Sequence, residues 1–170
     1  DTLLDSLVEQ VLDLTNAESG CAGLRTPQGM SCDHFFQGHS IVPLVYHCVT
    51  GVGWPGWVLA HRTHYLTNDV LNDPLVVQEV RDRLGIRSGI SVPIADNERD
   101  VIAFFEVYNK RDGAGFDEFD VQYSLSAARH GSLAIPDFLA RRHLKAPTAF
   151  RTALTSARRF VPVPSAVWPS

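Results

Sequence analysis

The sequence has few of the residues that secreted, membrane-spanning or metal-binding proteins need. Its 170 residues include three cysteines, an odd number with no CxxC pair, so we expect reduced thiols in a cytoplasmic setting. No apolar run approaches the roughly 20 residues that cross a bilayer, so no membrane association is expected. The chain begins at Asp1 with helix-like sequence, which predicts that it has no signal peptide and is part of a longer protein.

A basic surface is also lacking. The chain has 15 Lys and Arg against 19 Asp and Glu, a net charge of −4 and no long basic run, which argues against nucleic acid as a partner. A hydrophobic content of 45% predicts one domain with a substantial core. We place that domain at residues 1–146 and interpret the proline-containing segment 147–170 as a C-terminal extension or a linker to a missing output domain.

The pattern of apolar residues predicts an α+β domain with four helices and several strands. Asp73 is the expected N-cap of the third helix, Gly85 is its expected end, and Pro136 should kink or end the fourth helix. The terminal helices can pack together on one face of an antiparallel sheet, which leaves the middle helices on the other face. Helices are expected at residues 3–12, 51–62, 73–85 and from 117 onward, and strands at 19–26, 33–49, 63–69, 86–95 and 101–110.

The loop "VYNKRDGAGFDEFD" joins the last expected strand to the last expected helix. Asp117 can cap this helix while Asp120 reaches back to the cap, as in a capping box. Phe116 can fix the loop to the core, and Lys110 can form an ion pair with Asp120. Such a pair contributes only about 0–1 kcal/mol when exposed, so it must be partly buried to matter. This chemistry favours a structural role for the loop over a catalytic one.

The same loop resembles the Asn-Lys…Phe…Asp signature of GAF domains, best known from cyclic-nucleotide phosphodiesterases and adenylyl cyclases. Asn109, Lys110, Phe116 and Asp120 match this structural motif, while Val121 stands where the family has Glu. Other segments resemble family motifs in the same order. They are "GVGWPGWVLAHRTHYLTND", "NDP", "GIRSGISVPI" and "AARHGSLAI", and together the resemblance covers roughly residues 1 to 138.

The resemblance implies a GAF-like (profilin-like) fold with a central antiparallel sheet of about five to six strands. It places the terminal helices on one face, and the middle helices with a ligand pocket on the other. It also implies a non-catalytic sensory and regulatory domain, as in bacterial signalling proteins, that forms a homodimer through its terminal helices and controls a fused output domain. The implied ligand is a cyclic nucleotide or another small molecule.

Candidate pocket residues come from the middle helices and the facing strands. Glu106 shares a strand face with Ile102 and Phe104, so it either faces a pocket or is a costly buried charge. In cyclic-nucleotide-binding relatives, a Glu in "Glu-x-x-Asn-Lys" accepts a hydrogen bond from the base, and "EVYNK" matches this pattern. The alternatives are a Glu106 paired with a neighbouring Lys or Arg, a solvated Arg81 and a Trp57 in the core. The candidates are Trp54, Trp57, Thr67, Asn68, Asp69, Val77, Arg81, Ser88, Ser91 and Glu106.

Metal and bilin sites are not expected. Five histidines lie in one third of the chain with Cys32 and Cys48, but without HxH, CxxC or a helical HxxxH with an acid. In bilin-binding relatives and in free methionine sulfoxide reductases, the reactive cysteine lies just before the Val-Pro-Ile strand. The segment "EVRDRLGIRSG" has none, because the cysteines, Cys21 included, come earlier. Either chemistry would need Cys48 to reach the pocket.

Three hypotheses remain, and each predicts a different interior. A ligand sensor predicts a closed cavity with at least two polar groups that point inward. A pure dimerisation or scaffold module predicts that large side chains such as Trp57, Phe104 and Phe105 fill the space. A redox enzyme, similar to the free methionine sulfoxide reductases, predicts two sulfur atoms within bridging reach.

Overall fold

The computed structural model describes residues 2–145, and among these the side chains of residues 3–32, 35–137, 139 and 140. The predicted extension at 147–170 lies outside the described residues. The elements follow in the order α1 (Thr2–Thr15), β1 (Ala17–Thr26), β2 (Gly29–Gln37), β3 (Ser40–Val49), α2 (Gly53–His61), β4 (Tyr65–Thr67), α3 (Gln78–Leu84), β5 (Gly89–Ala95), β6 (Val101–Lys110) and α4 (Glu118–Lys145).

The strands form one sheet in the order β3-β2-β1-β6-β5-β4. Every pairing within it is antiparallel, which confirms the predicted α+β class. A polar turn joins β5 to β6, and in it Asp96 Oδ1 accepts hydrogen bonds from the backbone N–H groups of Glu98 and Asp100. Strands β1 and β6 lie at the centre, so side chains on β6 are covered on both faces.

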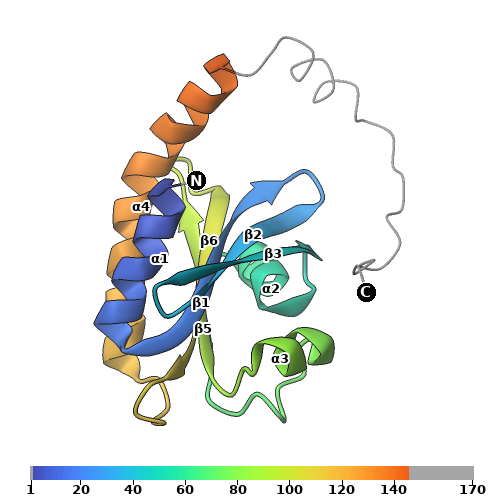
Figure 1. The fold of residues 1–170 in the computed structure, drawn as a ribbon. Coiled ribbons are helices and arrows are strands. Elements are labelled where there is room, and N and C mark those ends of the chain that lie inside the picture. The colour runs from blue at the N-terminus through green and yellow to red at the C-terminus, as the bar shows by residue number, and fades with distance from the viewer. Residues whose placement is uncertain (1, 146–170) are drawn as a thin grey trace.

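Helices lie on both faces of the sheet (Figure 1). On one face α1 and α4 lie side by side and enclose a core that includes Val8, Val11, Phe105 and Ile135. On the other face α2 and α3 cover a second core, which contains Trp54, Val58, Phe104 and Tyr108. Because side chains alternate along a strand, Phe105 and Val107 point to the terminal helices while Phe104 and Tyr108 point to α2 and α3.

The segment 33–49 is two strands and not the single strand that the sequence pattern predicted. Strands β2 and β3 form a hairpin, and Gln37 pairs with Ser40 across a two-residue turn. Gly38 adopts a φ of 59° in that turn, a conformation that glycine takes without a steric penalty. Pro43 is tolerated because β3 lies at the edge of the sheet, where one side of the strand needs no backbone donor.

Two helix boundaries also differ from the prediction. The third helix begins at Gln78, because Asp73 Oδ1 accepts a hydrogen bond from the Leu75 N–H (2.8 Å) and so forms a local turn instead of a helix cap. Its predicted end at Gly85 is confirmed, with a φ of 64°. Helix α4 continues through Pro136, and Ile135 is fully buried in the core, which helps to offset the hydrogen bond that proline removes.

Candidate ligand pocket

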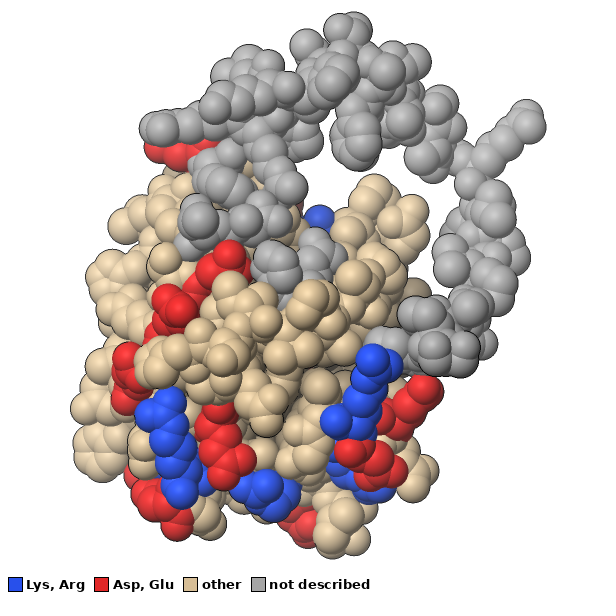
Figure 2. All heavy atoms as spheres, viewed as in Figure 1, with Lys and Arg blue, Asp and Glu red and all other residues tan. Residues whose placement is uncertain are grey.

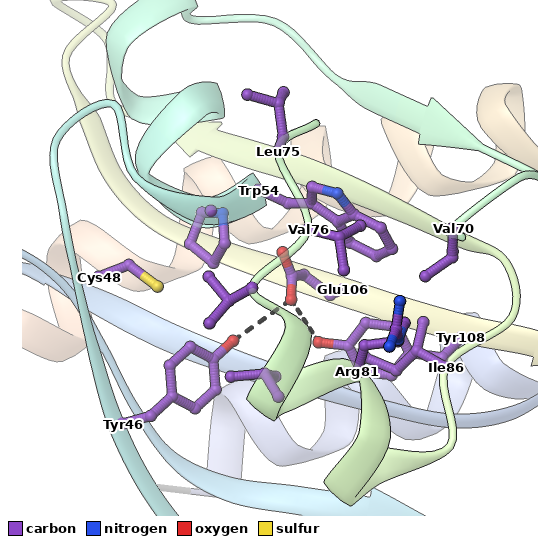
Figure 3. Close-up of a pocket in the computed structure, with 14 residues that line it drawn as sticks. Tyr46, Cys48, Trp54, Val70, Leu75, Val76, Arg81, Ile86, Glu106 and Tyr108 are labelled. Carbon is purple, nitrogen blue, oxygen red and sulfur yellow. Dashed lines mark hydrogen bonds between the residues drawn. The ribbon is translucent and has the colours of Figure 1, made fainter. Parts of the chain in front are cut away.

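A pocket lies between the sheet and the chain segments that cover its α2 and α3 face (Figure 3). Its volume is about 40 Å³. Pockets for drug-sized ligands hold roughly 300–1,000 Å³, so a cyclic nucleotide does not fit in this conformation. The lining residues are Tyr46, Cys48, Gly53, Trp54, Pro55, Val70, Leu75, Val76, Val77, Val80, Arg81, Ile86, Glu106 and Tyr108.

The carboxyl group of Glu106 lies at the sheet side of this pocket. Glu106 is only 2% exposed, and three donors from three strands converge on its Oε2 atom. The Tyr46 hydroxyl donates at 3.3 Å and the Cys21 thiol at 3.8 Å, and the Tyr108 hydroxyl donates as well. The other oxygen, Oε1, has no hydrogen-bond partner among the described residues. Figure 3 shows both tyrosine hydroxyls directed at one oxygen, while the other points away from them.

Burial raises the pKa of Glu106 above its ordinary value, and the groups around it oppose this effect. The main opposing group is the Tyr108 hydroxyl, followed by Ser91, Tyr46 and Cys21. Ser91 lies opposite Glu106 in the β5–β6 register, although its hydroxyl makes no hydrogen bond of normal geometry. Burial also raises the pKa of Tyr46 and of Tyr108, and the nearby Cys21 and Glu106 add to this. Both tyrosines therefore remain protonated donors at neutral pH.

Trp54 contributes a second buried polar atom without a partner. Its indole Nε1–H has no acceptor among the described residues, and the side chain is buried. The ring lies beside Tyr108 and Tyr65, with centroids 6.1 Å away in each case. Gly89 makes room for it, since a Cβ atom at that position would clash with the indole ring. The position of Trp54 thus depends on a glycine in β5.

Cys48 reaches the pocket from β3, which the sequence did not predict. Burial, with the charges of Glu106 and Cys21, raises the pKa of the Cys48 thiol to about 12, so the thiol stays protonated at neutral pH. All three cysteines are buried, and none forms a disulfide. A thiolate is the attacking form of cysteine, so this environment disfavours nucleophilic chemistry at Cys48.

Several sequence-predicted candidates lie in or beside the pocket and several do not. Trp54, Val77, Arg81 and Glu106 line it, and Arg81 binds Asp82 at 2.7 Å. The remaining candidates lie outside the lining. The Trp57 ring stacks on the ring of His61. The Thr67 hydroxyl accepts a hydrogen bond from the Asp69 N–H, and the Asp69 carboxylate accepts one from Asn72. The Asn68 side chain binds the backbone of Phe116, and the Ser88 N–H donates to Asn109.

Tyr46, Cys48, Tyr108 and Cys21 are not among the residues that the sequence pattern indicated for this site. Tyr46 and Cys48 lie two residues apart on β3, so they point to the same face of the sheet. This alternation could not be recognised while segment 33–49 was interpreted as one strand. Tyr108 could have been found, because it follows Glu106 at a spacing of two along the same strand.

A larger cleft of about 390 Å³ lies beside the end of α3, between Leu84, Arg87 and the strands β1 to β3. Two of its charged residues, Arg87 and Glu18, already bind each other at 2.8 Å. On the face shown in Figure 2, Lys and Arg side chains likewise stand beside Asp and Glu side chains. The cleft is therefore a weaker candidate for a ligand site than the buried pocket.

The signature loop has the structural chemistry that the sequence predicted. Lys110 Nζ binds Asp120 Oδ2 at 2.9 Å, with side chains 14% and 5% exposed. Asp117 and Asp120 each donate a backbone N–H to the other's carboxylate. The hydrogen bond to Asp120 raises the pKa of Lys110.

Asn109 occupies the left-handed region with a φ of 54°. Its Oδ1 accepts from the N–H groups of Arg87 and Ser88, and its Nδ2 donates to the Gly85 carbonyl. The loop thus joins the end of α3 to β6.

Within residues 2–145, no helix is both long and apolar enough to cross a membrane. Among the described side chains, no group of three or more His, Cys, Asp and Glu is placed to hold a metal ion.

Comparison with known proteins gives the chain a family. The family model described as the GAF domain matches residues 1–135. No curated protein matches the chain at a significant level.

Solved structures with a similar fold have different activities. The GAF domain of a phosphoenolpyruvate-protein phosphotransferase from Coxiella burnetii has a TM-score of 0.65 at 14% identity, and the match covers 84% of this chain and 85% of that one. A type II free methionine-R-sulfoxide reductase from Thermoplasma acidophilum has a TM-score of 0.64 at 14% identity, covering 81% and 92%. The blue-light absorbing PixJ GAF domain of Thermosynechococcus elongatus has a TM-score of 0.63 at 14% identity, covering 94% of each chain.

Proposed function

The chain belongs to the GAF domain family, and we propose that it is a non-catalytic sensory domain that binds a small molecule beside Glu106. Ligand binding would control a fused output domain through the terminal helices, in a cytoplasmic setting. Because the same fold serves a phosphotransferase, a reductase and a photoreceptor, the proposal depends on the chemistry of the pocket and not on the fold.

The unpartnered Glu106 Oε1 atom is the observation that carries this proposal. A buried polar atom without a partner costs about 1–3 kcal/mol, and more if it is charged. Three donors satisfy Oε2, while Oε1 has no partner among the described residues and belongs to a residue of the pocket lining. In a domain that serves only as a scaffold, the unpaired oxygen would lower stability without any benefit. A ligand that donates a hydrogen bond to Oε1 would offset this loss of stability.

The signature loop supplies a route from the pocket to α4. Residues Val80, Arg81 and Ile86 belong to the pocket wall, and Asn109 holds the turn that follows α3 through Gly85 and Ser88. A ligand changes a conformational equilibrium only if it binds the two states with different affinity. The present cavity is small, so a larger ligand would bind only when α3 has moved outward. Such a ligand would bind the open conformation more tightly than the present one and so meets this condition.

A thermal unfolding screen tests the proposal. The probes are cyclic nucleotides, purines, amino acids and small amides, each added to the wild type and to Glu106→Ala. A true ligand at a hundredfold its dissociation constant stabilises the wild type by about 2.7 kcal/mol, and it stabilises the variant less. If no probe shifts the wild-type unfolding, or if the variant responds equally, the sensory proposal is wrong.

A dimerisation or scaffold function is the second candidate, and the surface of α4 favours it. Phe119, Tyr123 and Leu133 are exposed, by 74%, 47% and 72%. Their spacing places them on one side of the helix, away from the core. We propose that this stripe mediates homodimerisation, either alone or together with ligand sensing.

A reductase function receives less support. With a pKa of about 12, the Cys48 thiol is ionised in only about one molecule in 10⁵ at pH 7.

A further inference from the structure

Two residues of the pocket lining, Glu106 and Trp54, each carry a buried polar atom without a hydrogen-bond partner among the described residues, and the two atoms have opposite hydrogen-bonding character. Glu106 Oε1 accepts hydrogen bonds when the carboxyl group is ionised, and Trp54 Nε1–H can only donate. Native proteins leave few buried polar groups without a partner, so each such group calls for an explanation. A single occupant that offers one donor and one acceptor would satisfy both atoms.

The rest of the lining restricts the charge of the occupant. The lining is largely apolar, and Arg81 is already bound to Asp82 at 2.7 Å. An anion would face the Glu106 carboxylate at close range. A cation such as an ammonium group would pair with Glu106 but would leave the Trp54 N–H without an acceptor. A neutral group that both donates and accepts avoids both problems.

The size and shape of the pocket favour a compact planar molecule. The volume of about 40 Å³ admits only a few heavy atoms. The rings of Tyr46, Trp54 and Tyr108 belong to the lining and offer flat surfaces to a planar group. Helix α3 contains no buried residue, so a small outward shift of this helix can admit a single ring.

We infer that the pocket binds a small uncharged amide or single-ring lactam, whose N–H donates to Glu106 Oε1 and whose carbonyl accepts from Trp54 Nε1–H. This inference rests on the proposed sensory function and names the chemical class of its ligand. The class excludes phosphate-bearing nucleotides, because Arg81, the one cation of the described lining, is already paired with Asp82.

Nuclear magnetic resonance of the full chain tests the inference at the atom concerned. The probes are acetamide, 2-pyrrolidinone and uracil, with methylammonium, acetate and a cyclic nucleotide for comparison. The chain has 3 tryptophans, so its spectrum has few indole N–H signals, and Trp54→Phe identifies the one from Trp54. As an amide is added, we expect the chemical shift of the Trp54 indole N–H to change until the binding site is saturated. The charged probes should leave this chemical shift unchanged.

Three variants separate the two hydrogen bonds from simple packing. Trp54→Phe keeps an aromatic ring but removes the donor, and it should weaken amide binding about tenfold. Glu106→Gln places a donor where Oε1 accepts, and it should weaken binding at least as much. Trp57→Phe is the matched control, because Trp57 stacks on His61 outside the pocket lining, and it should bind amides as the wild type does. Urea unfolding checks that each variant is folded.

The outcomes distinguish a wrong ligand class from a wrong function. If methylammonium, acetate or the cyclic nucleotide binds and the amides do not, with binding lost in Glu106→Gln, the amide inference is overturned while the sensory function stands. If no probe binds, the amide inference is overturned, and the sensory function is overturned with it if the purines and amino acids of the thermal screen also fail. Equal amide affinity in the wild type and Trp54→Phe would also refute the inferred hydrogen bond.

Discussion

Asn109 and Lys110 are adjacent in the chain, yet their side chains hold different parts of the domain. Asn109 binds Gly85, Arg87 and Ser88 in the turn after α3, next to the pocket wall. Lys110 binds Asp120 in the first turn of α4, which packs on the opposite face of the sheet. The last residues of β6 therefore connect the pocket side of the domain with a terminal helix.

Loss of the Lys110–Asp120 ion pair should destabilise the domain. Lys110→Met leaves the buried Asp120 carboxylate without its cation, and we expect the free energy of unfolding to fall by about 2–3 kcal/mol. Urea denaturation measures this change. The matched control is Arg62→Met, because the Arg62–Asp100 pair is 60% and 50% exposed and should contribute less than about 1 kcal/mol. Equal effects of the two substitutions would show that burial does not strengthen the signature pair.

The backbone conformation of Asn109 gives a second prediction. Asn109→Gly and Asn109→Ala both remove the three side-chain hydrogen bonds, but only alanine opposes the φ of 54°. The alanine variant should therefore be less stable than the glycine variant, by about 1 kcal/mol. Thermal unfolding of the two variants at one protein concentration measures the difference. A glycine variant that is the less stable of the two would contradict this account of the signature asparagine.

The buried carboxyl group of Glu106 should make stability depend on pH. Burial raises its pKa in the folded state above the ordinary value of 4.5, so the folded state binds this proton more tightly than the unfolded state. The stabilising contribution is then complete below about pH 4.5 and is lost as the pH rises through the folded pKa. Urea unfolding between pH 4 and pH 8 should show the wild type losing stability relative to Glu106→Gln. A pH-independent difference between the two would mean that Glu106 titrates at its ordinary pKa.

The exposed apolar stripe of α4 predicts how the domain associates. Phe119→Asp places a charge in the stripe. We expect the dissociation constant of the dimer to rise at least tenfold, because the aspartate must lose its water when the interface forms. Sedimentation measures the oligomeric state. The control is Leu71→Asp, because Leu71 is as exposed, at 79%, but does not lie on α4. A wild-type chain that is monomeric at all concentrations would remove the scaffold proposal.

The sequence by itself determined the features that are local in the chain. The helical periodicity of residues 3–12, the glycine that ends α3 and the reciprocal caps of Asp117 and Asp120 each depend on residues a few positions apart. The signature residues Asn109 to Asp120 also identified the family, and the family indicated Glu106 as a pocket residue. These features follow from backbone geometry and short-range hydrogen bonds, which a linear pattern contains.

Only the tertiary structure decided what surrounds Glu106 and how much space it leaves. Tyr46 and Cys21 lie 60 and 85 residues away in the chain, and they meet Glu106 because of the register of β3, β2, β1 and β6. A shift of one residue in any of these pairings would turn the side chains to the other face. The cavity volume depends on the same register and on how α3 packs, so no local pattern could have predicted it.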